Sequence, residues 1–149
     1  MSVSDPQLDP RGVRFAAALT TVVLAIVLLT GSGWLLAAQA VVFALAAFAG
    51  PRFAPYPLLF RTFVAPRLSP PTEREDAAPV RFSQLVGFVF ALVGTIGYLT
   101  GLAALGVVAT AFALVAAFLN AAFGFCLGCE MYALIHRFRT DRTTQGASA

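Results

Sequence analysis

Four long apolar runs dominate the sequence and restrict the folds open to it. They extend over about residues 13–30, 35–49, 82–99 and 102–136, and the last stays apolar to about Phe125 before it enters a cysteine motif. A helix needs roughly 20 mainly apolar residues to cross the hydrocarbon of a bilayer. The sequence therefore predicts one membrane-spanning helix for each run.

The composition excludes an ordinary soluble domain. Of the 149 residues, 59% are hydrophobic and 11% are charged, whereas soluble domains carry about 25% charged residues. The net charge of +3 would suit a nucleic-acid partner, but basic residues in a membrane protein usually report its topology. We therefore expect the lipid bilayer around this chain and no nucleic acid bound to it.

The arginines predict how the helices are oriented. All ten lie in the two tails (1–12 and 137–149, with Arg14 just beyond the first) and in the loop 51–81, whereas the turns near Gly31 and Gly101 carry no charge. Positive charge is retained on the cytoplasmic side of a membrane. Both termini and the long loop are therefore expected in the cytoplasm, which requires an even number of spans.

These observations predict an all-α fold with a single domain over 1–149. It is a multi-pass, integral membrane four-helix bundle in the inner (plasma) membrane, with a Pro-rich cytoplasmic loop between helices 2 and 3. A cleavable signal peptide is the alternative for the first run, because Ala38-Gln39-Ala40 resembles a cleavage site. That site lies inside the second apolar run, so we expect the first run to remain as a helix.

The loop 51–81 is long and rich in proline, which blocks regular structure. Leu58, Leu59, Phe60, Phe63 and Val64 surround Arg61 and predict a short amphipathic helix in the headgroup layer. Long loops are often functional. A connector with an interfacial anchor and a docking surface are the two interpretations, and the first is favoured.

Small and polar residues inside the runs are expected to serve helix packing. Gly97 and Gly101 form a Gly-x-x-x-Gly spacing, which lets helices approach closely. Packing within the chain is favoured over dimerisation, and a homo-oligomer stays open. Asn120 is expected to form an interhelical hydrogen bond. No sequence repeat is evident, although two successive helical hairpins would be a structural duplication.

The chemistry is expected in the segment Phe125-Cys126-Leu127-Gly128-Cys129-Glu130. It contains the only two cysteines of the chain, and Glu130 stands beside them. Residues three apart share a face of a helix, so Cys126 and Cys129 can form a disulfide or share a metal. Structural zinc normally takes four ligands, and His136 with Glu130 would make an improvised set. We therefore predict Cys126, Cys129 and Glu130 as site residues, with no metal and no cofactor.

Two conformations of this segment stay open. A helix beginning near Leu102 crosses about 30 Å of hydrocarbon by around Phe123, which places the cysteines near the cytoplasmic surface. If Gly124 breaks the helix, Cys126 begins a new one, whose N-terminus would stabilise its thiolate. If the helix is continuous, that stabilisation is absent, and one face carries Val115, Leu119, Ala122 and the cysteines towards His136. The reducing cytoplasm disfavours a permanent structural disulfide.

Several short motifs resemble a known family. They are Asp9-Pro10-Arg11 with Arg14-Phe15, Leu59-Phe60-Arg61, Pro66-Arg67-Leu68, the acidic stretch 73–76, Arg81-Phe82-Ser83-Gln84 and Phe125-Cys126-Leu127-Gly128-Cys129-Glu130. On these residues the chain resembles the bacterial family named domain of unknown function 4395. The resemblance implies a companion of thioredoxin-like proteins or rhodanese-type sulfurtransferases, and so redox or sulfur handling.

The leading hypothesis is a membrane thiol protein. Cys126 is predicted to attack and Cys129 to resolve, exchanging electrons or a sulfur atom with a soluble thioredoxin-like or sulfurtransferase partner, while Glu130 manages the proton. The alternatives are a subunit of a transporter for a small sulfur compound and a non-catalytic membrane scaffold. Whether the protein is an enzyme is left open.

Overall fold

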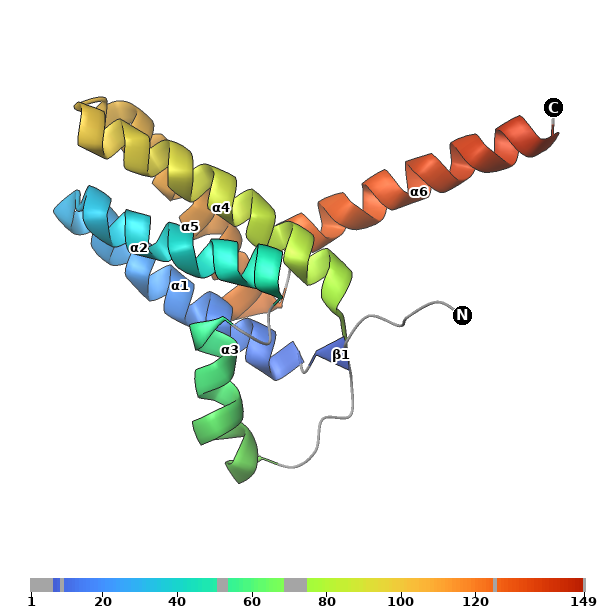
Figure 1. The fold of residues 1–149 in the computed structure, drawn as a ribbon, viewed down its shortest axis with the longest axis horizontal. Coiled ribbons are helices and arrows are strands. Elements are labelled where there is room, and N and C mark those ends of the chain that lie inside the picture. Colours follow the sequence, from blue (N-terminus) through green and yellow to red (C-terminus); the bar gives the residue numbers. More distant parts are fainter. Residues whose placement is uncertain (1–6, 9, 51–53, 69–74, 125, 149) are drawn as a thin grey trace.

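The computed structural model describes residues 7–8, 10–50, 54–68, 75–124 and 126–148, and almost all of them are helical (Figure 1). This confirms the all-α class. The longer helices are α1 (Pro10–Thr30), α2 (Gly33–Ala44), α4 (Ala77–Thr100), α5 (Ala103–Phe123) and α6 (Leu127–Ser148). The π-helical turn η1 (Leu45–Ala49) continues α2, and α3 (Pro55–Leu59) continues through η3 (Phe60–Val64) and η4 (Ala65–Arg67). Strands β1 (Gln7–Leu8) and β2 (Glu75–Asp76) form one short antiparallel pair.

Among the described residues, three helices are long and apolar enough to cross a membrane. They are α1, α4 and α5, with mean hydropathies of 2.2, 1.7 and 2.1. The second expected span is the shorter apolar helix Gly33–Ala49. The third expected span, 82–99, begins earlier than predicted, because α4 starts at Ala77 inside the expected loop.

The helix expected over 102–136 is wrong as one continuous element. It divides at Gly124, whose φ of +68° lies in the left-handed region and whose N–H donates to the carbonyl of Asn120 at 3.0 Å. Non-glycine residues adopt this conformation at a cost of about 1–2 kcal/mol, so a glycine here favours the end of a helix. The second part, α6, continues to Ser148 through the segment expected as a tail.

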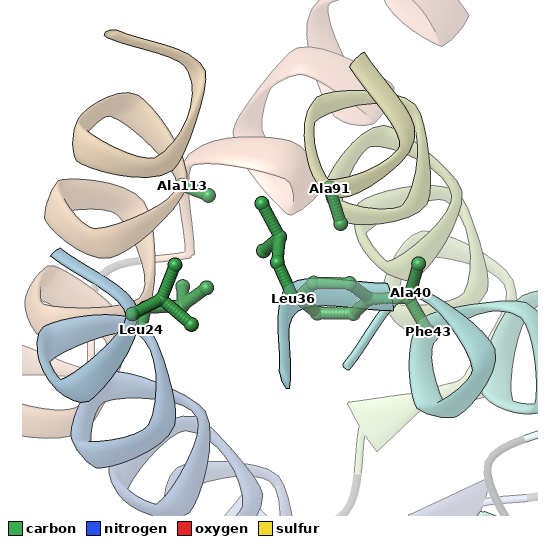
Figure 2. Close-up of a cluster of buried hydrophobic side chains, with 7 residues drawn as sticks. Leu24, Leu36, Ala40, Phe43, Ala91 and Ala113 are labelled. Atoms are coloured by element: carbon green, nitrogen blue, oxygen red, sulfur yellow. The ribbon is translucent and has the colours of Figure 1, made fainter. Parts of the chain in front are cut away.

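The helices form two hairpins, α1–α2 and α4–α5, which pack against each other. Helix α1 packs mainly on α5 and α2 packs mainly on α4, so the first helix of each hairpin contacts the second helix of the other. Figure 2 shows side chains from all four helices around a common centre. The buried cluster there consists of Leu24, Val27, Leu36, Ala40, Phe43, Ala91 and Ala113.

The outward surface of these helices is apolar. Leu29 is 87% exposed, Trp34 75% and Phe112 62%. A continuous apolar exterior of this kind marks a surface that lipid or another protein covers. It matches the predicted bilayer environment.

Arginines tie the two hairpins together at one end. The Arg14 guanidinium, in α1, donates to the carbonyls of Ala121 and Ala122 at 3.2 and 3.3 Å. Arg81, at the corresponding place in α4, donates to the carbonyls of Ala47 and Phe48 at 3.1 and 3.2 Å. Each arginine thus satisfies carbonyls that a helix end leaves unpaired. The arrangement is reciprocal, like the packing of the hairpins.

Helices α3 and α6 extend away from the bundle at the arginine end (Figure 1). Phe60 is buried and lies against Gly12 and the ring of Phe15, whereas Leu58 and Phe63 are 48% and 63% exposed. The segment is therefore helical, as predicted. Its role as an anchor or a docking surface stays a prediction.

Gly97 serves contact within the chain. A Cβ atom on it would lie 2.6 Å from the backbone nitrogen of Gly106 and 3.0 Å from the carbonyl oxygen of Leu102. Only a glycine permits α4 and α5 to approach so closely. The Gly-x-x-x-Gly spacing is accounted for by this hairpin.

Candidate functional site

Cys126 occupies the N-cap of α6. Its carbonyl oxygen accepts from the N–H of Glu130 at 3.0 Å, which is the first hydrogen bond of the helix. Its Sγ accepts from the N–H of Cys129 at 3.2 Å. A side-chain atom that accepts from the third helical residue is the usual form of an N-cap. The sulfur of Cys126 therefore does what a serine or aspartate oxygen does at most helix starts.

Cys126 and Cys129 are joined by a disulfide, with Cα atoms 5.2 Å apart. Of the two conformations that the sequence left open, the broken helix is the one found. The N–H of Cys129 and the positive end of the α6 dipole would favour the thiolate of reduced Cys126. Cys129 is the third residue of α6, in the same first turn, and the N–H to sulfur hydrogen bond is accepted by Cys126.

Contacts from two other helices fix the motif in place. Arg14 holds the end of α5 at Ala121 and Ala122, five and four residues before Cys126. Gly128 packs on α4, where an added Cβ would lie 2.6 Å from the Cα of Ser83. The rings of Phe82 and Tyr132 contact each other at a tilt, with centroids 5.8 Å apart. The first turns of α6 are thus held against α4 and positioned by α1.

Cys126 also forms part of the wall of a cavity of about 690 Å³. It is partly open, and residues of α1, α2 with η1, α3 with η3, α4, α5 and the start of α6 line it. Most of the wall is apolar. The polar or charged side chains that line it are Thr20, Tyr56, Arg61, Ser83, Gln84 and Asn120. The volume lies within the range of about 300–1,000 Å³ that small-molecule sites occupy.

Tyr56 forms the α3 side of the cavity. Its hydroxyl donates to Gln39 Oε1 at 2.7 Å, which links α3 to the buried face of α2. Burial raises the pKa of Tyr56 above its ordinary value. The hydroxyl therefore stays protonated as a donor throughout the neutral range.

Cys129 and Glu130 lie off the cavity, which Cys126 alone of the three predicted site residues lines. Glu130 is exposed in the first turn of α6. The continuous face from Val115 to His136 does not form, because Gly124 separates its two halves. The His136 ring instead lies 6.0 Å from the Tyr132 ring. Within the described ranges, no group of three or more His, Cys, Asp or Glu residues could hold a metal ion.

The polar residues of the cavity wall were not predicted from the sequence. Asn120 was expected to bond between helices, but its side chain and that of Gln84 line the cavity without a hydrogen-bond partner among the residues described. Ser83 and Gln84 belong to one of the motifs that carry the family resemblance. That motif was the sequence signal that could have identified them as site residues. What the motif could not show is that α4 brings them beside the first turn of α6.

The fold and this site define an α-helical protein of membrane character, with a Cys-x-x-Cys disulfide at a helix N-terminus on the wall of a partly open cavity. The chain belongs to the family described as Domain of unknown function (DUF4395), which matches residues 8–137. This confirms the resemblance seen in the sequence. No curated protein and no solved structure matches the chain.

Proposed function

We propose that this protein is a membrane thiol–disulfide exchange protein that passes two electrons between its Cys126–Cys129 pair and a soluble thioredoxin-like partner. The observation that carries the proposal is the disulfide at the N-cap of α6, where Cys126 Sγ accepts the N–H of Cys129. This is the environment that lowers the cost of forming a thiolate. With a sulfurtransferase partner, the same Cys126 thiolate would accept a sulfur atom from that partner.

The exchange follows from the two environments. The Cys126 thiolate attacks the disulfide of the partner, a mixed disulfide forms, and one partner thiolate leaves. Cys129 then attacks Cys126 Sγ, which releases the second partner thiol and closes the Cys126–Cys129 disulfide. Two electrons pass to the partner with two protons, and the reverse reaction runs through the same steps. Glu130, exposed beside Cys129, accepts the Cys129 proton in this scheme.

The proposal includes a topology. Helix Gly33–Ala49 has 17 residues, which reach about 25 Å, so with a slightly thinned bilayer it is the fourth span of the four-helix bundle. Both termini, α3 and the cysteine pair then face the cytoplasm of the inner membrane. Arg14 and Arg81 at the same end of the bundle support this, because arginine is retained inside. Reporter fusions at both termini test it, and an external reporter at either end would contradict it.

Trapping the mixed disulfide tests the exchange itself. A Cys129→Ala variant keeps Cys126 and removes the resolving thiol, so it should accumulate a covalent adduct that reductant releases. The matched control is the Cys126→Ala, Cys129→Ala double variant, which should yield none. If the single variant forms no adduct and its Cys126 is inert to alkylation in membranes, the proposal is wrong.

A transporter subunit for a small sulfur compound is the second candidate, because Cys126 is part of a cavity wall inside the bundle. Uptake into vesicles distinguishes the two functions. Uptake that depends on both cysteines would favour the transporter. Uptake that survives the double replacement would reject it.

A further inference from the structure

The cavity beside Cys126 has a polar end and an apolar remainder. Gln84 and Ser83 lie on α4 where Gly128 packs, and Asn120 lies in the last turn of α5, whose carbonyl accepts from Gly124. All three therefore belong to the segments that adjoin the start of α6. The amide groups of Gln84 and Asn120 make no hydrogen bond within the described part of the chain. Gln84 and Asn120 line the same cavity as Cys126, and their amide groups can donate hydrogen bonds.

The remainder of the cavity runs between the membrane-length helices. Its wall there includes Ala17, Phe90, Phe112, Ala113 and Ala116. Arg61 also lines the cavity, but this apolar part disfavours charged thiol compounds, because burying an unpaired charge costs many kcal/mol. An uncharged, lipid-soluble ligand is the kind that suits this part of the wall.

We propose that the cavity binds a membrane quinone, which oxidises the Cys126–Cys129 dithiol. A quinone combines a ring with two carbonyl acceptors, suited to the amides of Gln84 and Asn120, and an isoprenoid chain suited to the apolar remainder. It is also a two-electron acceptor, which matches the two electrons that a dithiol releases. The inference rests on the proposed function, since it names the compound that returns the reduced pair to the disulfide.

The reaction balances without a further reactant. The Cys126 thiolate adds to a ring carbon of the quinone, forming a C–S bond, and the ring takes up a proton. Cys129 then attacks Cys126 Sγ, so that the S–S bond forms, the C–S bond breaks and the electron pair leaves with the ring. A second proton completes the hydroquinone. In total, two thiols are oxidised to one disulfide and one quinone is reduced to one hydroquinone.

The test uses the full chain in phosphatidylcholine vesicles, reduced, freed of reductant and mixed with ubiquinone-1. We expect one hydroquinone and one disulfide per protein, followed by ultraviolet absorbance and by thiol alkylation. The Ala116→Leu variant fills the cavity and should slow the reaction at least tenfold. Val115→Leu is the matched control, because Val115 is 54% exposed and lies off the cavity. Its rate should equal that of the wild type.

Leucine at Gln84 or Asn120 gives a second readout. Either replacement should raise the ubiquinone-1 concentration needed for half-maximal rate and leave the reactivity of Cys126 with maleimide unchanged. Equal rates in the wild type and Ala116→Leu would overturn the proposal, because oxidation would then occur in the lipid rather than in the cavity. A cavity that retains phospholipid and rejects ubiquinone-1 would also overturn it.

Failure of this inference is distinguishable from failure of the proposed function. The same vesicles are mixed with oxidised thioredoxin, and mixed disulfides of the Cys129→Ala variant are counted. Mixed disulfides without oxidation by ubiquinone-1 would refute the quinone site alone. The absence of both reactions would refute the exchange function and, with it, this inference.

Discussion

Replacing Arg14 by glutamine tests whether α1 controls the cysteine site from a distance. Arg14 Nη2 donates to the carbonyls of Ala121 and Ala122 at 3.2 and 3.3 Å, at the end of the helix that leads into Gly124 and Cys126. A hydrogen bond from a charged group contributes about 1.5–3 kcal/mol. One nitrogen donates to both carbonyls, and the Arg14 side chain is exposed. We therefore expect the two hydrogen bonds together to contribute about 1–2 kcal/mol to stability.

In some molecules the end of α5 and Cys126 are displaced from their positions in the structure. A loss of this size would increase the fraction of such molecules about 5–30-fold. The assay is the rate at which maleimide labels Cys126 in the reduced protein, with Cys129 replaced by alanine so that one thiol reports. Arg14→Gln should label several-fold faster than the parent, and Arg14→Lys should fall between them because it keeps the charge.

Arg81→Gln is the control for the Arg14 experiment. It removes the equivalent interaction with Ala47 and Phe48 at the other hairpin, which leads away from the cysteines. Its labelling rate should stay near that of the parent. Equal acceleration in Arg14→Gln and Arg81→Gln would refute the reasoning, because it would show general loosening of the bundle rather than local control of Cys126.

Three further predictions follow from particular contacts. Gly128→Ala should lower the free energy of unfolding in detergent by about 1–3 kcal/mol, because its Cβ would lie 2.6 Å from the Ser83 backbone; unchanged thermal stability would contradict the packing of α6 on α4. Cys126→Ser should preserve the N-cap, whereas Cys126→Ala should cost about 0.5–2 kcal/mol, both compared with the reduced protein by denaturant titration; equal stabilities would remove the N-cap assignment. Tyr56→Phe should cost about 1–3 kcal/mol, because it leaves the buried Oε1 of Gln39 unpaired, and a further Gln39→Leu change should recover most of the loss. Since burial raises the pKa of Tyr56, stability from this group is complete below the unfolded value of about 10 and declines above it; this alkaline decline should be smaller in Tyr56→Phe, and an identical pH profile would contradict the assignment.

Much of the fold followed from the pattern of apolar runs. The turns at Gly31 and Gly101 and the apolar helices they join were predicted, because a helix in lipid must satisfy its backbone internally and its length is fixed by the bilayer. The end of α5 was not predicted, although Gly124 was recognised as one of two choices. A glycine tolerates the helical and the left-handed conformation alike, so the sequence alone did not decide between them.

The site was predicted in part. Cys126 and Cys129 were found from their spacing, and the structure joins them. Glu130 was selected as a lone carboxylate within an apolar stretch, but it is exposed on α6 and lies off the cavity. Its proposed role in handling a proton stays a prediction, as do the catalytic roles of the two cysteines.

By itself, the sequence determined that this chain forms apolar helices of membrane length, places its arginines at one end and carries a thiol pair after the last long run. These properties depend on the composition of the chain and on the order of neighbouring residues, both of which exist before the chain folds. Only the tertiary structure decided that Arg14 reaches α5, that α5 ends at Gly124 and that Gln84 and Asn120 line one cavity with Cys126. Those contacts join residues far apart in the chain, and they exist only once the two hairpins have packed against each other.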